Sequence, residues 1–278
     1  KSAWQTASKV VLVGAGWIGL EVAAAARAAG LDVTVLESAE LPLLNVLGRE
    51  NAAVFADLHR AHDVDLRLGT HITEITGADP NRATGVRLGD GEVVSGDLVV
   101  VGVGVEPNID LARAAGLITD NGIRVEADLR SSNHDIYAAG DAANAFHPLL
   151  GKHIRVEHWA NALNQPAVAV KSMLGMDAVY ERLPYFYSDQ YELGMEYTGY
   201  VTPGGYDDVV FRGDSSALEY VTFWLKDGLV LAGMNVNVWD VTTDVGALVR
   251  SGRPVDRALL ADPSVPLAEV LAAADPEA

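Results

Sequence analysis

One stretch near the beginning of the chain restricts its fold more than any other. Residues 10–13 form an apolar run typical of a buried strand, and Gly14-Ala15-Gly16-Trp17-Ile18-Gly19 follows at once. A helical pattern then continues to about Ala29, and residues 33–36 predict a second strand that ends at Glu37. Strand, glycines, helix, strand and acid in this order predict a dinucleotide-binding βαβ unit. A glycine-rich turn without a ligand is the alternative interpretation.

Each glycine of this turn has a separate expected role. Gly14 allows the tight turn, Gly16 lets a pyrophosphate approach the backbone, and Gly19 lets the helix pack closely on the strand. The free N–H groups and the positive dipole end at the start of the helix favour phosphate groups. The sequence therefore predicts that the phosphates of the dinucleotide bind at this turn.

The acid at the end of the second strand predicts which dinucleotide binds. Glu37 lies 18 residues after Gly19, where a carboxylate can accept hydrogen bonds from the hydroxyl groups of the adenosine ribose. The same carboxylate would repel a 2′-phosphate. We therefore expect NAD(H) to be favoured over NADP(H).

The composition excludes several classes of function. The chain has 278 residues, of which 49% are apolar, and its formal net charge is −18. This charge disfavours nucleic acid and anionic membranes as partners. The sequence has no cysteine, which excludes a disulfide framework and thiol catalysis by these residues. We find neither an apolar run of membrane-spanning length nor a signal peptide, and we expect a cytoplasmic protein.

Two histidines raise the question of a metal site. His59 and His62 lie on the same face of a predicted helix, but the sequence offers no evident third ligand. We interpret both as part of a solvated surface, and we expect no metal. The sequence also lacks a Ser/His/Asp arrangement, and we expect no catalytic acid, base or nucleophile.

A second glycine pair follows another predicted strand. Residues 98–101 are apolar and lead into Gly102, Val103 and Gly104. Ligands bind at the carboxyl ends of the strands in a parallel sheet, so this segment is expected near the nicotinamide end of the dinucleotide. A tight turn before Pro107 is the alternative interpretation.

A third motif lies further along the chain. Residues 135–139 predict a strand that delivers Gly140 and Asp141 to the start of a helix. This arrangement would bring one carboxylate and several free N–H groups to a second ligand-binding edge. Asp141 can also act only as an N-cap, and the two roles are compatible.

The motifs occur in a characteristic order along the chain. They comprise Val13–Glu21, Glu37, Gly102–Asn108, Ile136–Asp141, Arg155–Ala162 and Pro184–Tyr191. Over nearly its whole length the chain resembles the flavin-dependent NADH reductases that pass electrons to ferredoxin, rubredoxin or putidaredoxin. The related apoptosis-inducing-factor group shares the resemblance.

The resemblance implies roles for individual residues. Asp141, preceded by Gly140, would bind the ribityl chain of FAD, and Glu157, His158 and Trp159 would lie beside the isoalloxazine ring. The nicotinamide pocket would be lined by Glu21 and Ile18, and the cofactor-binding set also includes Trp17. A core position is the alternative for Trp159, because an aromatic residue on a helix is usually buried.

The resemblance also implies an α/β fold of three parts. Residues 1–104 would form a Rossmann-like NAD(H)-binding domain, residues 105–180 the second segment of an FAD-binding domain, and residues 181–278 a C-terminal α+β interface domain. The first FAD segment of the family, with its own glycine motif, has no counterpart in this sequence. We therefore expect a fragment with low FAD affinity that self-associates through the open edge and uncovered apolar face of the half-domain.

In the family, hydride passes from NADH to FAD, and single electrons then pass to a ferredoxin-type iron–sulfur protein. The resemblance implies this function for the intact protein, whereas the chain alone is expected to be inactive. Ferredoxins are usually acidic, so Arg250, Arg253 and Arg257 are candidates for a local basic patch. The alternatives are a flavin-free NAD(H)-binding module and an NADH oxidase-type flavoprotein.

Overall fold

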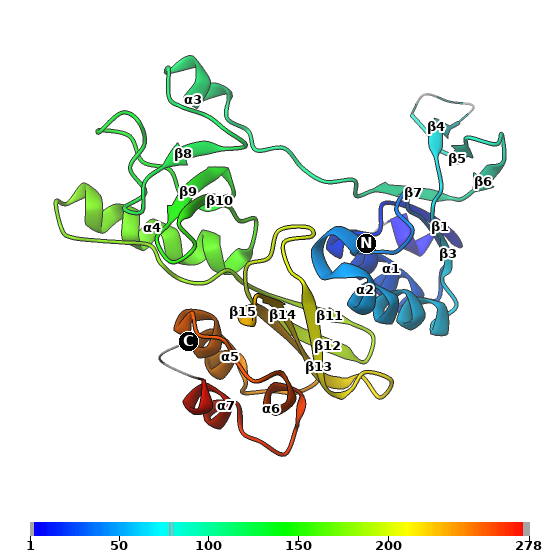
Figure 1. Ribbon diagram of the computed structural model, residues 1–278. Coiled ribbons are helices and arrows are strands. Elements are labelled where there is room, and N and C mark those ends of the chain that lie inside the picture. Colours follow the sequence, from blue (N-terminus) through cyan, green and yellow to red (C-terminus); the bar gives the residue numbers. More distant parts are fainter. Residues whose placement is uncertain (1–2, 78, 80, 275–278) are drawn as a thin grey trace.

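The computed structural model describes residues 3–77, 79 and 81–274, which contain four β-sheets together with helices (Figure 1). A short 3-10 helix, Ala3–Gln5, precedes the first strand. The outermost residues of the predicted first and last domains, 1–2 and 275–278, lie outside the described residues.

A parallel sheet near the beginning of the chain contains the predicted βαβ unit. Its strands are β1 (Lys9–Val13), β2 (Asp32–Leu36), β3 (Asp65–Arg67) and β7 (Leu98–Val101), in the order β3-β2-β1-β7. The helices α1 (Trp17–Ala28) and α2 (Leu44–Ala61) connect β1 to β2 and β2 to β3. This confirms the predicted order of strand, glycine turn, helix and strand.

Both faces of this sheet are covered, which explains why residues 10–13 of β1 are all apolar. The strands β4 (Ile72–Thr76), β5 (Gly85–Leu88) and β6 (Val93–Ser95) form an antiparallel sheet. Side chains of β5 and β6 pack on Val11 and Val13. Val10 and Leu12 face the other way, into the core formed with the helices. Strands buried on both faces read as continuous apolar runs.

The C-terminal part contains a five-stranded antiparallel sheet in the order β11-β12-β15-β14-β13. Its strands are β11 (Tyr185–Gln190), β12 (Leu193–Gly199), β13 (Asp208–Asp214), β14 (Glu219–Lys226) and β15 (Leu229–Val236). One face is covered by α5 (Thr242–Ser251), α6 (Arg257–Ala261) and α7 (Leu267–Ala273).

The opposite face of this sheet packs against α1 and α2. Strand β14 shows this by alternation, because successive side chains point to opposite faces. Phe223 packs toward α5–α7, whereas Tyr220 and Trp224 belong to the core that includes Phe55 of α2. The indole N–H of Trp224 donates to the carbonyl of Leu47 over 3.1 Å. The nucleotide-binding unit and the C-terminal sheet therefore share one core.

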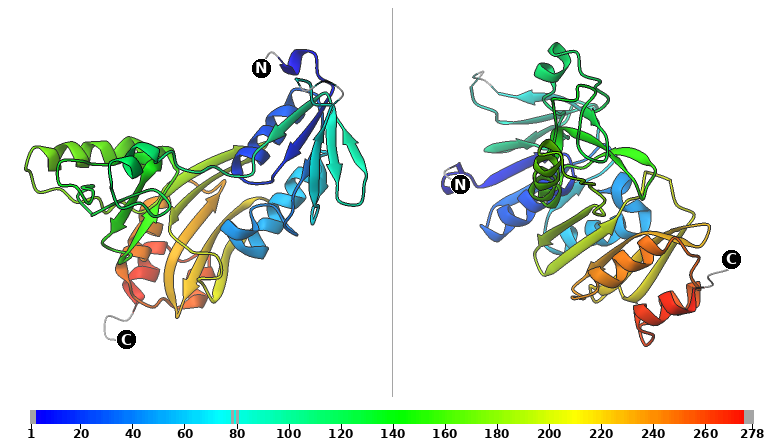
Figure 2. Two further views of the ribbon diagram at one scale, coloured as in Figure 1. Left: turned by 90° about the horizontal axis from the view of Figure 1, so that it is seen from above. Right: turned by 90° about the vertical axis from the view of Figure 1, so that its left-hand side faces the viewer.

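The middle of the chain forms a smaller unit. It contains α3 (Asp110–Ala114), the sheet β10-β9-β8 and the long helix α4 (Trp159–Met173). The strands are β8 (Ile123–Val125), β9 (Ala143–His147) and β10 (Lys152–Arg155). An extended stretch after β7 leads to this unit (Figure 1), and Figure 2 shows the C-terminal sheet between it and the parallel sheet.

The prediction that a helix begins at Gly140 and Asp141 is wrong. The structure has a three-residue 3-10 turn, Gly140–Ala142, that leads directly into β9. Parallel pairing of β9 with β8 takes up the residues that follow the turn. The strand predicted before the turn is reduced to a single bridge between Arg130 and Tyr137. Long-range strand pairing here outweighs the local pattern.

Candidate functional site

The glycine turn has the geometry of a phosphate cradle. Gly14 has φ +99°, and a Cβ there would collide with the carbonyl of Gly102. A Cβ on Gly19 would collide with the carbonyl of Gly14, whereas one on Gly16 would meet no atom within 4 Å. Gly14 and Gly19 are thus required by packing within the fold. Open space at Gly16 leaves room for a ligand against the backbone.

Glu37 lies beside this turn, at the carboxyl end of β2. Its Oε2 accepts from the backbone N–H of Ala15 over 2.7 Å. Its Oε1 accepts from the N–H of Ala39 over 2.8 Å and from the hydroxyl of Ser38 over 3.1 Å. These bonds fix a negative charge where the ribose end of a dinucleotide was predicted.

A cavity of about 460 Å³ opens where three parts of the chain meet. The start of α1 contributes Trp17, Ile18 and Glu21, and the segment before α4 contributes residues 155–159. The C-terminal sheet and its flanks contribute Pro184, Phe186, Tyr187, Tyr197 and 199–201, and α2 contributes Val46. Six of the predicted site residues line this one cavity: Trp17, Ile18, Glu21, Glu157, His158 and Trp159.

Several apolar side chains on the cavity wall are exposed. Ile18 is 68% exposed and Trp159 is 69% exposed. Trp159 therefore does not occupy the core position that was its alternative interpretation. Exposed apolar groups gathered around one hollow are typical of a ligand-binding surface.

An aromatic cluster supports the cavity from behind. The ring of Trp17 meets Phe55 edge-on at 5.4 Å and Phe186 at 5.1 Å. Phe186 stacks on Tyr197 at 4.9 Å, and His158 lies 4.5 Å from Phe186. This cluster links α1, α2, the segment before α4 and the C-terminal sheet.

Besides Glu21, the polar groups of the cavity include His158, Glu157 and Arg155. Nδ1 of His158 is buried and has no hydrogen-bond partner among the described residues. Burial lowers the pKa of His158, against opposing contributions from Glu157 and Asp141. Arg155 pairs with Glu157 and donates to the carbonyl of Asp141 over 3.2 Å. Within the described residues the buried Nδ1 of His158 is left without a partner behind the cavity wall, whereas Glu157 on the wall can accept hydrogen bonds from a ligand.

Other predicted site residues lie outside the cavity lining. Gly102 packs against Gly14, but Val103 is 71% exposed and Gly104 follows in the extended stretch after β7. The N–H of Gly140 donates to Gln165 over 2.7 Å, and Asp141 is exposed at the 3-10 turn.

The sequence analysis missed some residues of the lining. Arg155 lies within the quoted motif, two residues before Glu157, and this spacing on an extended chain could have indicated it. Val46, Tyr197 and residues 199–201 carry no local signal, because their place depends on how the C-terminal sheet meets α1 and α2.

The interpretation of His59 as a solvated residue is wrong. Its side chain is fully buried, and Nε2 lies 2.9 Å from Oε1 of Gln190 on β11. His62 is half-buried, stacks on Tyr191 and pairs with Glu192. In the described part of the chain no group of three or more His, Cys, Asp or Glu residues could hold a metal ion.

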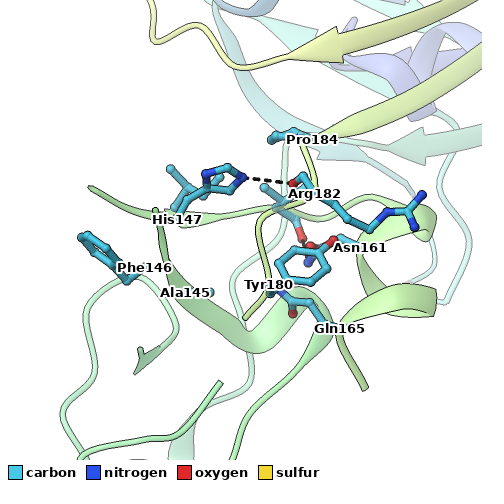
Figure 3. Close-up of a pocket in the computed structure, with 10 residues that line it drawn as sticks. Ala145, Phe146, His147, Asn161, Gln165, Tyr180, Arg182 and Pro184 are labelled. Carbon is cyan, nitrogen blue, oxygen red and sulfur yellow. Dashed lines mark hydrogen bonds between the residues drawn. The ribbon is translucent and has the colours of Figure 1, made fainter. Parts of the chain in front are cut away.

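A smaller cavity lies inside the middle unit, lined by His147, Tyr180 and Arg182 among others (Figure 3). Its volume is about 10 Å³, space for at most one water molecule. Nε2 of His147 donates to the carbonyl of Arg182 over 3.0 Å, and burial lowers the pKa of His147. This cavity is too small for a cofactor.

No helix among residues 3–77, 79 and 81–274 has the length and apolar character needed to cross a membrane.

The parallel sheet, the glycine turn and the cavity beside it define a dinucleotide-binding protein. Residues 1–166 match the pyridine nucleotide-disulphide oxidoreductase family, and residues 185–271 match the reductase C-terminal family. The chain belongs to the pyridine nucleotide-disulphide oxidoreductase family, which confirms the resemblance found in the sequence.

Curated relatives include an anthranilate 1,2-dioxygenase system ferredoxin–NAD(+) reductase component from Burkholderia cepacia. It is 41% identical over 263 residues, which cover 93% of this chain and 63% of the relative. Putidaredoxin reductase from Pseudomonas putida is 36% identical over 97% of this chain and 64% of its own length. The chain thus spans less than two thirds of these relatives.

Solved structures with the same fold include a ferredoxin reductase from Rhodopseudomonas palustris. The TM-score is 0.90 at 35% identity, over 96% of this chain and 66% of that one. A covalent putidaredoxin reductase–putidaredoxin complex also gives a TM-score of 0.90, at 36% identity over 96% of this chain and 64% of that chain. These similarities confirm the predicted fold class.

Proposed function

We propose that this chain is the NADH-binding and interface part of a flavoprotein reductase, which takes hydride from NADH and passes single electrons to a ferredoxin-type iron–sulfur protein. One observation carries the proposal. Residues that follow the glycine turn and residues 157–159 of the middle unit line a single cavity. Hydride transfer needs two cofactors in contact, with reacting atoms about 3–3.5 Å apart, and this cavity joins both predicted sites.

Residues at the turn would hold the nicotinamide coenzyme. Open space at Gly16 takes the pyrophosphate, and Glu37 takes the ribose and disfavours a 2′-phosphate. Ile18 and Glu21 at the cavity wall take the nicotinamide end. Val103 and Gly104, on the stretch after Gly102, are the less supported members of the set.

Residues of the middle unit would hold FAD. Trp159 offers an exposed ring, and Glu157 and His158 line the same cavity. Gly140 and Asp141 lie in the 3-10 turn Gly140–Ala142, and Arg155 links Asp141 to Glu157 of the cavity wall. Bound FAD supplies the two-electron to one-electron conversion, and the protein supplies position and electrostatics.

The basic patch predicted at Arg250, Arg253 and Arg257 has fewer free positive charges than the sequence suggested. Arg257 is paired with Asp208 over 2.6 Å, which offsets its charge. Arg250 donates to the carbonyl of Glu181 over 3.0 Å and lines a shallow hollow with Arg253. These two arginines are the remaining candidates for contact with an acidic iron–sulfur protein.

Self-association is also part of the proposal. Helix α4 buries Asn161, Gln165, Ala169 and Ser172, and its other side is apolar and exposed. The exposed side chains are Trp159, Leu163, Val170, Met173 and Leu174. Such a stripe favours association.

The domain boundaries at 104 and 180 and a cytoplasmic location stay predictions.

Equilibrium titrations test this function on the chain as it exists. We expect saturable NADH binding, much weaker NADPH binding, and loss of this preference in Glu37→Ala. We also expect weak, saturable FAD binding that quenches tryptophan fluorescence less in Trp159→Phe. Equal affinity for NADH and NADPH would contradict the role of Glu37. NADH binding without any FAD binding would favour the flavin-free module.

A catalytic test separates the remaining alternative. In the intact protein with FAD bound, NADH-driven reduction of cytochrome c is expected to require added ferredoxin. An NADH oxidase-type flavoprotein would instead consume oxygen without ferredoxin.

A further inference from the structure

A row of buried polar side chains runs from the cavity into the shared core. The hydroxyl of Ser188 donates to Oε1 of Glu21 over 2.7 Å. Nε2 of Gln190 donates to the hydroxyl oxygen of Ser188 over 3.1 Å, and Oε1 of Gln190 lies 2.9 Å from Nε2 of His59. We call Ser188, Gln190 and His59 the donor relay.

Chemistry fixes the direction of every hydrogen bond in this row. The carboxylate of Glu21 only accepts when ionised, so the single hydroxyl proton of Ser188 points to it. The oxygen of Ser188 must then accept, which turns the amide group of Gln190 toward it and leaves Oε1 to accept from His59. His59 therefore carries a proton on Nε2, which in the neutral ring is the Nε2–H tautomer.

The far end of the row agrees with this tautomer. The hydroxyl oxygen of Tyr191 lies 3.4 Å from Nδ1 of His59. Burial raises the pKa of Tyr191 to about 12, so its hydroxyl keeps the proton at neutral pH. Burial also lowers the pKa of His59, which favours the neutral ring. All bonds thus donate toward Glu21, an arrangement in which each bond polarises the next.

Burial makes this arrangement costly unless each group is paired. Ser188 is 1% exposed, and Gln190 and His59 are fully buried. They come from β11 and α2, whereas Glu21 is on α1. Burying a polar group in an apolar core costs free energy when the group has no hydrogen-bond partner. The row therefore ties Glu21 on α1 to β11 through Ser188 and, through Gln190 and His59, to α2.

We propose that the donor relay holds the carboxylate of Glu21 in one orientation at the cavity wall and thereby positions the nicotinamide end of the dinucleotide. With Oε1 held by Ser188, Oε2 can accept from a ligand donor such as the carboxamide N–H of nicotinamide. Ser188, Gln190 and His59 do not line the cavity, so they act only through Glu21. The identity of the ligand in this inference rests on the proposed function.

A double-mutant cycle tests the relay. Ser188→Ala removes the last donor and leaves nearly the same volume. We expect NADH affinity to fall about tenfold in Ser188→Ala, a typical loss for a bond to a charged group. The same loss is expected in Glu21→Gln, and adding Ser188→Ala to Glu21→Gln should change affinity less than about twofold.

A matched control separates positioning from stability. Thr222→Val breaks the 3.3 Å bond between Asn51 and Thr222, which is buried at the same interface but does not reach the cavity. This variant should unfold more easily and bind NADH as the unaltered chain does. If Thr222→Val weakens NADH binding as much as Ser188→Ala, the effect is structural and the inference is overturned.

Nuclear magnetic resonance tests the direction of the relay without any nucleotide. Long-range ¹H–¹⁵N spectra at neutral pH should show the Nε2–H tautomer for His59, assigned by its loss in His59→Gln. An Nδ1–H tautomer would overturn the inference. Unchanged NADH affinity in Ser188→Ala would overturn it alone, whereas absence of NADH binding by the unaltered chain would overturn the proposed function with it.

Discussion

The two sides of the cavity are supported in different ways. On the nucleotide side, α1 and α2 share one core with the C-terminal sheet, and Phe55, Trp224 and Met234 are fully buried in it. On the opposite side, the middle unit has a small core around Leu129 and Tyr180. Its helix α4 leaves an apolar stripe exposed. Only the nucleotide side is buried against a second layer of the described residues.

This difference explains what each side can do within the described structure. The glycine turn, Glu37 and Glu21 are held by packing and by hydrogen bonds from several elements. Trp159 and His158 project from a unit with fewer buried neighbours. We therefore expect NADH binding to be largely preformed and FAD binding to be weak.

Truncation in the shared core should have the largest effect. Trp224→Ala is expected to lower the free energy of unfolding by about 3–5 kcal/mol. Hydrogen exchange should rise together in α1, α2 and the C-terminal sheet, because they form one core. The matched variant Leu129→Ala should lower protection only in residues 105–180. If hydrogen exchange rises in the C-terminal sheet alone after Trp224→Ala, α1 and α2 do not share one core with this sheet.

A methyl group at Gly19 should have the next largest effect. Its Cβ would collide with the backbone carbonyl of Gly14, and backbone cannot move aside cheaply. We expect Gly19→Ala to lose about 1–3 kcal/mol of unfolding free energy in denaturant titrations, as overpacked sites do. Stability equal to that of the unaltered chain would contradict the close packing of α1 on β1.

Acidification should weaken the shared core through His59. Burial lowers the pKa of His59 below its usual 6.5. The unfolded chain therefore takes up a proton below about pH 6.5 that the folded chain refuses, and stability falls as the pH falls, by at most about 1.4 kcal/mol per pH unit for this group. His59→Gln should reduce this slope in denaturant titrations between about pH 7 and pH 5.5. An unchanged slope would mean that His59 does not contribute.

The smallest effect on stability is expected on the exposed stripe of α4. Leu163 is 59% exposed, so Leu163→Lys should change the free energy of unfolding by less than about 0.5 kcal/mol. The same change should lower self-association in analytical ultracentrifugation, because it puts a charge in the stripe. Self-association that persists unchanged would place the contact elsewhere.

The sequence predicted what local patterns determine. The glycine turn and Glu37 were predictable because the turn, the helix start and the strand end follow one another along the chain. The burial of His59 was not, because its partner Gln190 lies 131 residues away. The prediction of a helix after Asp141 failed for the same reason, because it did not take into account that β9 pairs with the earlier strand β8. The position of Tyr197 on the cavity wall likewise depends on tertiary packing.

The central claim is that the turn binds a dinucleotide at Gly16, and calorimetric titration with NADH tests it most directly. A Cβ at Gly16 meets no protein atom within 4 Å, so Gly16→Ala should fold and melt almost as the unaltered chain does. We expect saturable binding of one NADH per unaltered chain and an affinity at least tenfold lower in Gly16→Ala, because the added side chain takes the place of the pyrophosphate. Equal NADH affinity in both proteins, or none in the unaltered chain, would contradict it.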